Sequence, residues 1–185
     1  MTYFDPNGVH NPSTGTAPPA SWGDIVRDDL VWLAGDSTGG NPKPMCRVYN
    51  NAGQNIATAT FTALTFNSER YDTAGLHSTS SNTSRITIPT GGGGIYHIGA
   101  SVRFASNSTG ARVVRIRRNG SGYIGVQEAD ASATGDHRMS LACDYFLFEG
   151  DYIEVMAFQS SGGVLSVDSE SAMSPEFWVH WVGLG

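Results

Sequence analysis

The chain has 185 residues, a net charge of −6 and a pI near 5.2, and only 15% of its residues are charged. This acidic composition argues against a general nucleic-acid-binding protein, because phosphate binding requires clustered Lys and Arg side chains. Hydrophobic residues make up 39% of the chain, which is enough to build the core of one domain. A surface this poor in charge favours contact with other proteins, since charges are depleted at the centre of interfaces.

Targeting segments are not evident in the sequence. The first residues, Met-Thr-Tyr-Phe-Asp-Pro, lack the basic start and apolar run of a signal peptide. No stretch approaches the ~18 apolar residues that a membrane-spanning helix needs. We therefore expect a protein that is made in a cytoplasm and has no membrane span.

The first 44 residues are predicted to be an anchoring region with a linker. Residues 1–20 contain four prolines, which remove backbone donors and favour an extended arm. Residues 21–34 are predicted to be a helix, because Ser21-Trp22-Gly23-Asp24 matches a capping pattern and apolar residues recur at helical spacing. We expect this apolar stripe to dock on its own domain, on other copies or on a larger particle; it consists of Trp22, Ile25, Val26, Leu30 and Leu33.

Residues 45–185 are predicted to form one all-β domain. Apolar and polar residues alternate in many short segments, and turn signals such as Asn119-Gly120 separate them, which is typical of a sandwich or jelly roll. The predicted strands are Met45–Tyr49, Thr58–Phe66, Arg85–Ile88, Ile95–Phe104, Arg112–Arg118, Tyr123–Gln127, His137–Phe148, Tyr152–Ser160, Val164–Val167 and Phe177–Leu184.

Several segments of this domain, in this order, resemble one known superfamily. They are Gly94-Ile95-Tyr96-His97-Ile98, the Gly150-Asp151-Tyr152-Ile153 strand start and the aromatic strand Phe177–Val182. Together they resemble the jelly-roll heads of complement and tumour necrosis factor. The segment Phe61–Ser80 and the leader Ala20–Leu30 look like the form found in bacteriophage virion proteins. The resemblance implies an antiparallel jelly roll that forms a homotrimer.

The aromatic content of the strands agrees with such an assembly, because one thin sandwich does not readily hide so many rings. The candidates for the trimer interface are Tyr145, Tyr152, Phe158, Trp178 and Trp181. For each of them the alternative is a place in the domain's own core.

The sequence contains no recognisable catalytic motif. The five histidines are scattered without metal-ligand spacing, and no Gly-X-Ser-X-Gly elbow occurs. Cys46 and Cys143 lie far apart in the sequence, which favours two free buried thiols over a disulfide. We therefore expect no enzyme activity, no cofactor and no metal.

One strand is rich in arginine. Alternation places Arg115 and Arg117 on one face with Val113, and Arg112 and Arg118 on the other face. Arg115 and Arg117 are candidates for contact with an acidic partner. The alternative is an exposed face on which their stems cover the sheet.

These observations predict a non-enzymatic bacteriophage structural protein that is located in the virion. The N-terminal region would anchor it to other virion proteins, and the trimeric head would act as a minor tail or fibre-tip protein that contacts a host-surface glycan or protein. One alternative is a capsid decoration or head-fibre protein that stabilises the shell. Another is a carbohydrate-binding module of a bacterial surface system.

Overall fold

The computed structural model describes residues 43–185, apart from 133, 134 and 172. The chain divides into two compact units, Met1–Pro42 and Lys43–Gly185. The domain boundary that the sequence predicts between residues 44 and 45 stays a prediction. The predicted arm and helix, with the stripe of Trp22, Ile25, Val26, Leu30 and Leu33, lie outside the described residues.

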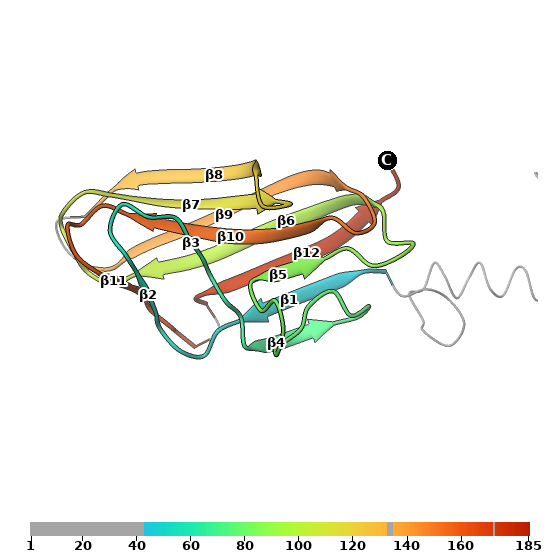
Figure 1. Ribbon diagram of the computed structural model, residues 1–185, viewed down its shortest axis with the longest axis horizontal. Coiled ribbons are helices and arrows are strands. Elements are labelled where there is room, and N and C mark those ends of the chain that lie inside the picture. The colour runs from blue at the N-terminus through green and yellow to red at the C-terminus, as the bar shows by residue number, and fades with distance from the viewer. Residues whose placement is uncertain (1–42, 133–134, 172) are drawn as a thin grey trace, which may run out of the picture. The chain divides into compact units, whose positions relative to one another are not determined.

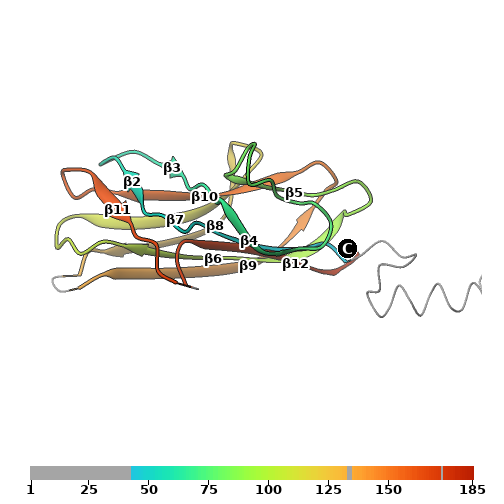
Figure 2. The ribbon, with the colours of Figure 1, turned by 90° about the horizontal axis from the view of Figure 1, so that it is seen from below.

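Within the described residues the domain consists of two antiparallel sheets (Figures 1 and 2). The larger sheet runs in the order β2 (Gln54–Ile56), β11 (Leu165–Val167), β6 (Gly94–Phe104), β12 (Glu176–Gly183), β1 (Met45–Tyr49) and β4 (Ser68–Asp72), and β9 (His137–Leu147) pairs with β6. The smaller sheet runs in the order β3 (Thr62–Ala63), β10 (Tyr152–Gln159), β7 (Ala111–Arg118) and β8 (Gly122–Asp130), and β5 (Arg85–Thr87) also pairs with β10.

Alternation along the strands builds the core between the two sheets. In β6, Tyr96, Ile98 and Phe104 are buried, whereas His97 between them is only half-buried. In β10 of the opposite sheet, Ile153 and Val155 belong to the same buried cluster. The two inner faces therefore share one apolar core, and the two outer faces form the surface of the domain.

Most predicted strands are confirmed, and Met45–Tyr49 has the predicted bounds. The single strand predicted over Thr58–Phe66 is wrong, because the segment forms only the two-residue strand β3, Thr62–Ala63, and an isolated bridge from Thr58 to Gln159. Ala59 interrupts this segment with a φ of 57°, in the left-handed region that strands do not use. The strand β4 was not predicted, since its sequence Ser-Glu-Arg-Tyr-Asp lacks apolar alternation.

Arg112 is fully buried and faces the core from the start of β7. Its guanidinium donates to the carbonyl oxygens of Asn107, Thr109 and Ala111 at 2.9 to 3.0 Å. Desolvation lowers the pKa of this arginine. Two of its three acceptors, the carbonyl oxygens of Asn107 and Thr109, belong to the preceding loop, so the buried cation fixes the path of that loop.

Both cysteines are free thiols, as the sequence favours, but only Cys46 is buried as predicted. Cys46 is buried in β1, and Cys143 is half-buried in β9. Burial, together with the charges of Asp72 and Glu69, raises the pKa of the Cys46 thiol. Cys46 therefore behaves as a small apolar residue of the core.

Candidate interaction surfaces

The five aromatic residues predicted for a trimer interface do not share one surface. Tyr145 and Trp181 are partly buried and pack against the core cluster. Tyr152 and Phe158 lie on the outer face of the smaller sheet, and Trp178 lies on the outer face of the larger sheet. The interface role of each residue stays a prediction, but no single contact surface contains all five.

A buried glutamate organises the outer face of the larger sheet. Glu176, 1% exposed, begins β12 and accepts from Arg47 Nε at 3.0 Å and from Arg70 Nε at 3.1 Å. The Arg70 guanidinium lies over the Tyr49 ring at 4.1 Å, and that of Arg47 lies 5.8 Å from the Trp178 ring. The carboxylate is thus compensated by two cations that are themselves packed on aromatic rings.

Two histidines lie opposite each other near the middle of the same face. His180 of β12 pairs in register with His97 of β6. The Tyr71 hydroxyl lies 2.6 Å from His180 Nε2, and Asp144 Oδ1 lies 2.8 Å from His97 Nδ1. Desolvation and the charges of His97 and Arg47 lower the pKa of His180. His180 therefore favours its neutral form in the folded domain.

The strands β6 and β1 begin, and β9 and β12 end, at the same end of the larger sheet (Figure 1). Several large apolar residues at or beside these strand ends are exposed. The rings of Phe146 and Phe148 meet edge to face at 4.9 Å, and Phe148 is 63% exposed. We call this group the terminal apolar patch; it contains Met45, Phe146, Phe148, Val182 and Leu184. The sequence prediction did not select these residues, although alternation in β9 places Phe146 and Phe148 on one face.

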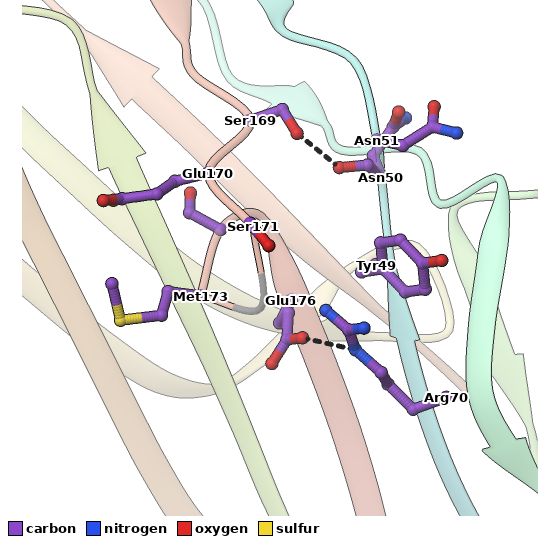
Figure 3. A pocket seen from close by; sticks show the side chains of 10 residues that line it. Tyr49, Asn50, Asn51, Arg70, Ser169, Glu170, Ser171, Met173 and Glu176 are labelled. Carbon is purple, nitrogen blue, oxygen red and sulfur yellow. Dashed lines mark hydrogen bonds and ion pairs between the residues drawn. The ribbon is translucent and has the colours of Figure 1, made fainter.

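A polar cavity lies toward the opposite end of this face; Figure 3 shows the side chains that line it. It has a volume of about 370 Å³ and lies between the end of β1 and the segment that precedes β12. Tyr49, Asn51, Arg70 and Ser171 contribute a ring, an amide, a guanidinium and a hydroxyl to its wall. This mixture of groups fits a small polar ligand.

A second buried glutamate organises the outer face of the smaller sheet. Glu154, 4% exposed, accepts from Arg117 at 2.7 and 3.2 Å and from the Ser84 hydroxyl at 2.9 Å. Arg85 lies 3.5 Å from the same carboxylate and 4.0 Å from the centre of the Tyr152 ring. Arg117, one of the two arginines predicted to contact an acidic partner, therefore already has an acidic partner within the domain.

Arg115, the other predicted arginine, is held by aromatic rings. Its guanidinium carbon lies 4.4 Å from the centre of the Phe61 ring and 4.8 Å from that of Tyr123. Phe61 also packs against Phe158, with ring centres 4.9 Å apart. Sequence reasoning missed Phe61 and Tyr123, because only the pairing of β3, β10, β7 and β8 brings these residues together.

Among residues 43–185, with the three gaps given above, no three His, Cys, Asp or Glu side chains are grouped to hold a metal ion. The same part of the chain contains no helix of the length and apolar character that crossing a membrane requires.

Comparison with known proteins shows what the chain resembles. No family model and no curated protein matches it. The globular domain of zebrafish complement 1qA protein matches with a TM-score of 0.53 and 13% identity, over 77% of this chain and 100% of that chain. Murine APRIL at pH 8.0 gives a TM-score of 0.57 at 14% identity, over 75% of this chain and 98% of that chain. Eiger TNF from S. frugiperda matches with a TM-score of 0.56 and 10% identity, over 77% of this chain and 94% of that chain.

These likenesses show the fold. The domain is an antiparallel jelly roll like those of complement 1q and tumour necrosis factor proteins, which confirms the predicted fold class.

Proposed function

We propose that this protein is a non-enzymatic binding protein whose jelly-roll domain assembles into a homotrimer. The observation that carries the proposal is the terminal apolar patch. Monomeric proteins rarely expose contiguous apolar patches larger than a few hundred Å², and such patches are typical of protein contacts. In the patch, Phe148, Val182 and Leu184 are 63%, 60% and 76% exposed. Three copies that bury this end would remove these side chains from water.

Sedimentation of the full-length protein tests the assembly. We expect a trimer, and we expect the double substitution Phe146→Ser and Phe148→Ser to shift it to the monomer without changing the circular dichroism spectrum. The matched control is Val164→Ser, which alters a 67% exposed apolar residue outside the patch. A monomeric wild-type protein would contradict the proposal.

We also propose that the trimer is a structural component of a bacteriophage virion, as a minor tail or fibre-tip protein that contacts the host surface. The support is the sequence of Phe61–Ser80 and of the leader Ala20–Leu30, which resemble such proteins. A chain that lacks residues 1–44 should keep a folded domain and no longer join particles. Labelled protein that binds host cells favours the tail role, whereas binding to empty capsids alone favours the decoration or head-fibre role.

The polar cavity beside Tyr49 favours carbohydrate binding as a second candidate function. Side-chain amide and hydroxyl groups line it, and sugars bind through hydrogen bonds to such groups. A glycan array probed with the wild-type protein and with Asn51→Ala tests this function. Binding that Asn51→Ala does not weaken would argue against a sugar site in this cavity.

A further inference from the structure

Arg115 differs from the other arginines of the described residues in having no acceptor. Arg47 and Arg70 bind Glu176, and Arg85 and Arg117 bind Glu154. The remaining four are also paired: Arg103 and Arg138 with Asp136 and Glu170, Arg118 with Asp151, and Arg112 with loop carbonyls. Among the arginines of residues 43–185, outside the gaps, Arg115 is the only one without a hydrogen-bond acceptor or an ion pair, and its guanidinium contacts aromatic rings alone.

The surroundings of Arg115 hold its side chain in place. Phe61 and Tyr123 lie against the guanidinium, and Met156, 4% exposed, lies opposite Arg115 on β10. A guanidinium that is already restrained loses less conformational entropy when a ligand binds. The planar group keeps free N–H donors, which match the geometry of a carboxylate.

The rim that β8 gives this site contains both apolar and acidic side chains. Val126 of β8 lies opposite Arg115 and is 60% exposed, and Tyr123 is 49% exposed. Glu128, which lies two residues after Val126 in β8, is exposed and has neither a hydrogen bond nor an ion pair. Its uncompensated charge would repel a chain of phosphates or a polyanionic glycan. The site therefore fits one carboxylate that is flanked by apolar groups.

We propose that Arg115, with Phe61, Tyr123 and Val126, binds an acidic side chain of a partner protein whose neighbouring residues are apolar. The carboxylate would accept from the Arg115 guanidinium, and the apolar neighbours would cover Val126 and the exposed part of Tyr123. The site does not depend on the trimer, because the terminal apolar patch belongs to the other sheet. Arg117 takes no part, since Glu154 already binds it.

Nuclear magnetic resonance titration of the full-length protein tests this site. The probe is the peptide acetyl-Leu-Glu-Phe-amide, and its matched control is acetyl-Leu-Gln-Phe-amide. We expect the Glu peptide to shift the Arg115 Nε–H and Val126 methyl resonances, and to bind roughly tenfold more tightly than the Gln peptide, because a charge-assisted hydrogen bond is lost. Arg115→Gln should remove this preference, and Arg115→Lys should reduce it.

The control variant is Arg138→Gln, which removes a 52% exposed arginine from the other sheet and should leave binding unchanged. Equal binding of the two peptides, or shifts centred on Arg138, would overturn the proposal. So would glucuronate or inorganic phosphate that binds Arg115 more tightly than the Glu peptide does. Self-association that Arg115→Gln abolishes would assign the site to a second copy of this chain instead.

Discussion

The outer faces of the larger and the smaller sheet each contain one buried glutamate that is compensated by two arginines. On the larger sheet Glu176 is bound by Arg47 and Arg70, and on the smaller sheet Glu154 is bound by Arg117 and Arg85. In both places aromatic rings pack on the guanidinium groups. Unrelated strands have thus satisfied a buried charge in the same way.

The two faces differ in what these clusters leave exposed. The larger sheet has the terminal apolar patch at one end, with no arginine among its residues. The smaller sheet has an arginine between two rings and no acceptor for it. The first arrangement suits association driven by apolar burial, and the second suits recognition of a charge. One domain therefore presents two surfaces of different chemistry.

Removal of either buried glutamate should have the largest effect on stability. Glu176→Ala and Glu154→Ala each leave two arginines without their acceptor, and we expect each to lower the free energy of unfolding by about 3 kcal/mol. Urea denaturation measures both values. Glu128→Ala, which removes an exposed and unpaired carboxylate, is the control and should change stability by less than about 0.5 kcal/mol. Clearly unequal losses would show that the two clusters are not equivalent.

Gly99 should be the next most sensitive position, and it is specific to the larger sheet. The Trp178 ring covers it so closely that an added Cβ would lie 2.2 Å from Trp178 Cζ2. We expect Gly99→Ala to lower the free energy of unfolding by about 2 kcal/mol, because the indole must move. Gly163→Ala is the matched control, since nothing lies within 4 Å of its added Cβ. If both variants unfold at the same urea concentration, the close packing of Trp178 does not contribute to stability.

The smallest expected effect is a dependence of the domain's stability on pH, which arises in the larger sheet. Its source is His180, whose pKa is lowered by burial, by His97 and by Arg47. The unfolded chain, with a histidine pKa of about 6.5, takes up a proton more readily than the folded domain. His180 therefore contributes fully to stability above that pH, and the contribution is lost as the pH falls through the lower pKa of the folded state. Urea midpoints measured from pH 8 to 5 should fall less in His180→Gln, and an equal fall would exclude His180 as the cause.

The sequence predicted the fold, and the face of a strand on which a side chain lies, better than it predicted contacts between strands. Alternation correctly placed Arg115 and Arg117 on one face of β7 and Arg112 on the other. It did not reveal that Glu154 lies opposite Arg117, because that pairing depends on the register of β10 with β7. The pairing of Arg47 with Glu176 joins residues 129 positions apart in the sequence, and no local pattern records such a contact.

The aromatic residues illustrate a second limit of sequence reasoning. Tyr145 and Phe146 are neighbours in β9, yet Tyr145 packs against the core and Phe146 is exposed. Side chains alternate along a strand, but alternation alone does not say which face is the core. The selection of Tyr145 for an interface, with Phe146 and Phe148 left out, followed from that ambiguity.

The buried Arg112 has a consequence for how the neighbouring loop can evolve. Its acceptors are the carbonyl oxygens of Asn107, Thr109 and Ala111, which every amino acid supplies. The side chain at position 109 can therefore be exchanged while the acceptors stay in place. Asn107 and Gly110 are more constrained: Asn107 Oδ1 accepts from the Thr109 amide at 2.8 Å, and Gly110 has a φ of 74° and no room for a Cβ beside Ser160. A single cation inside the domain thus holds this loop by its backbone, which leaves position 109 open to sequence variation.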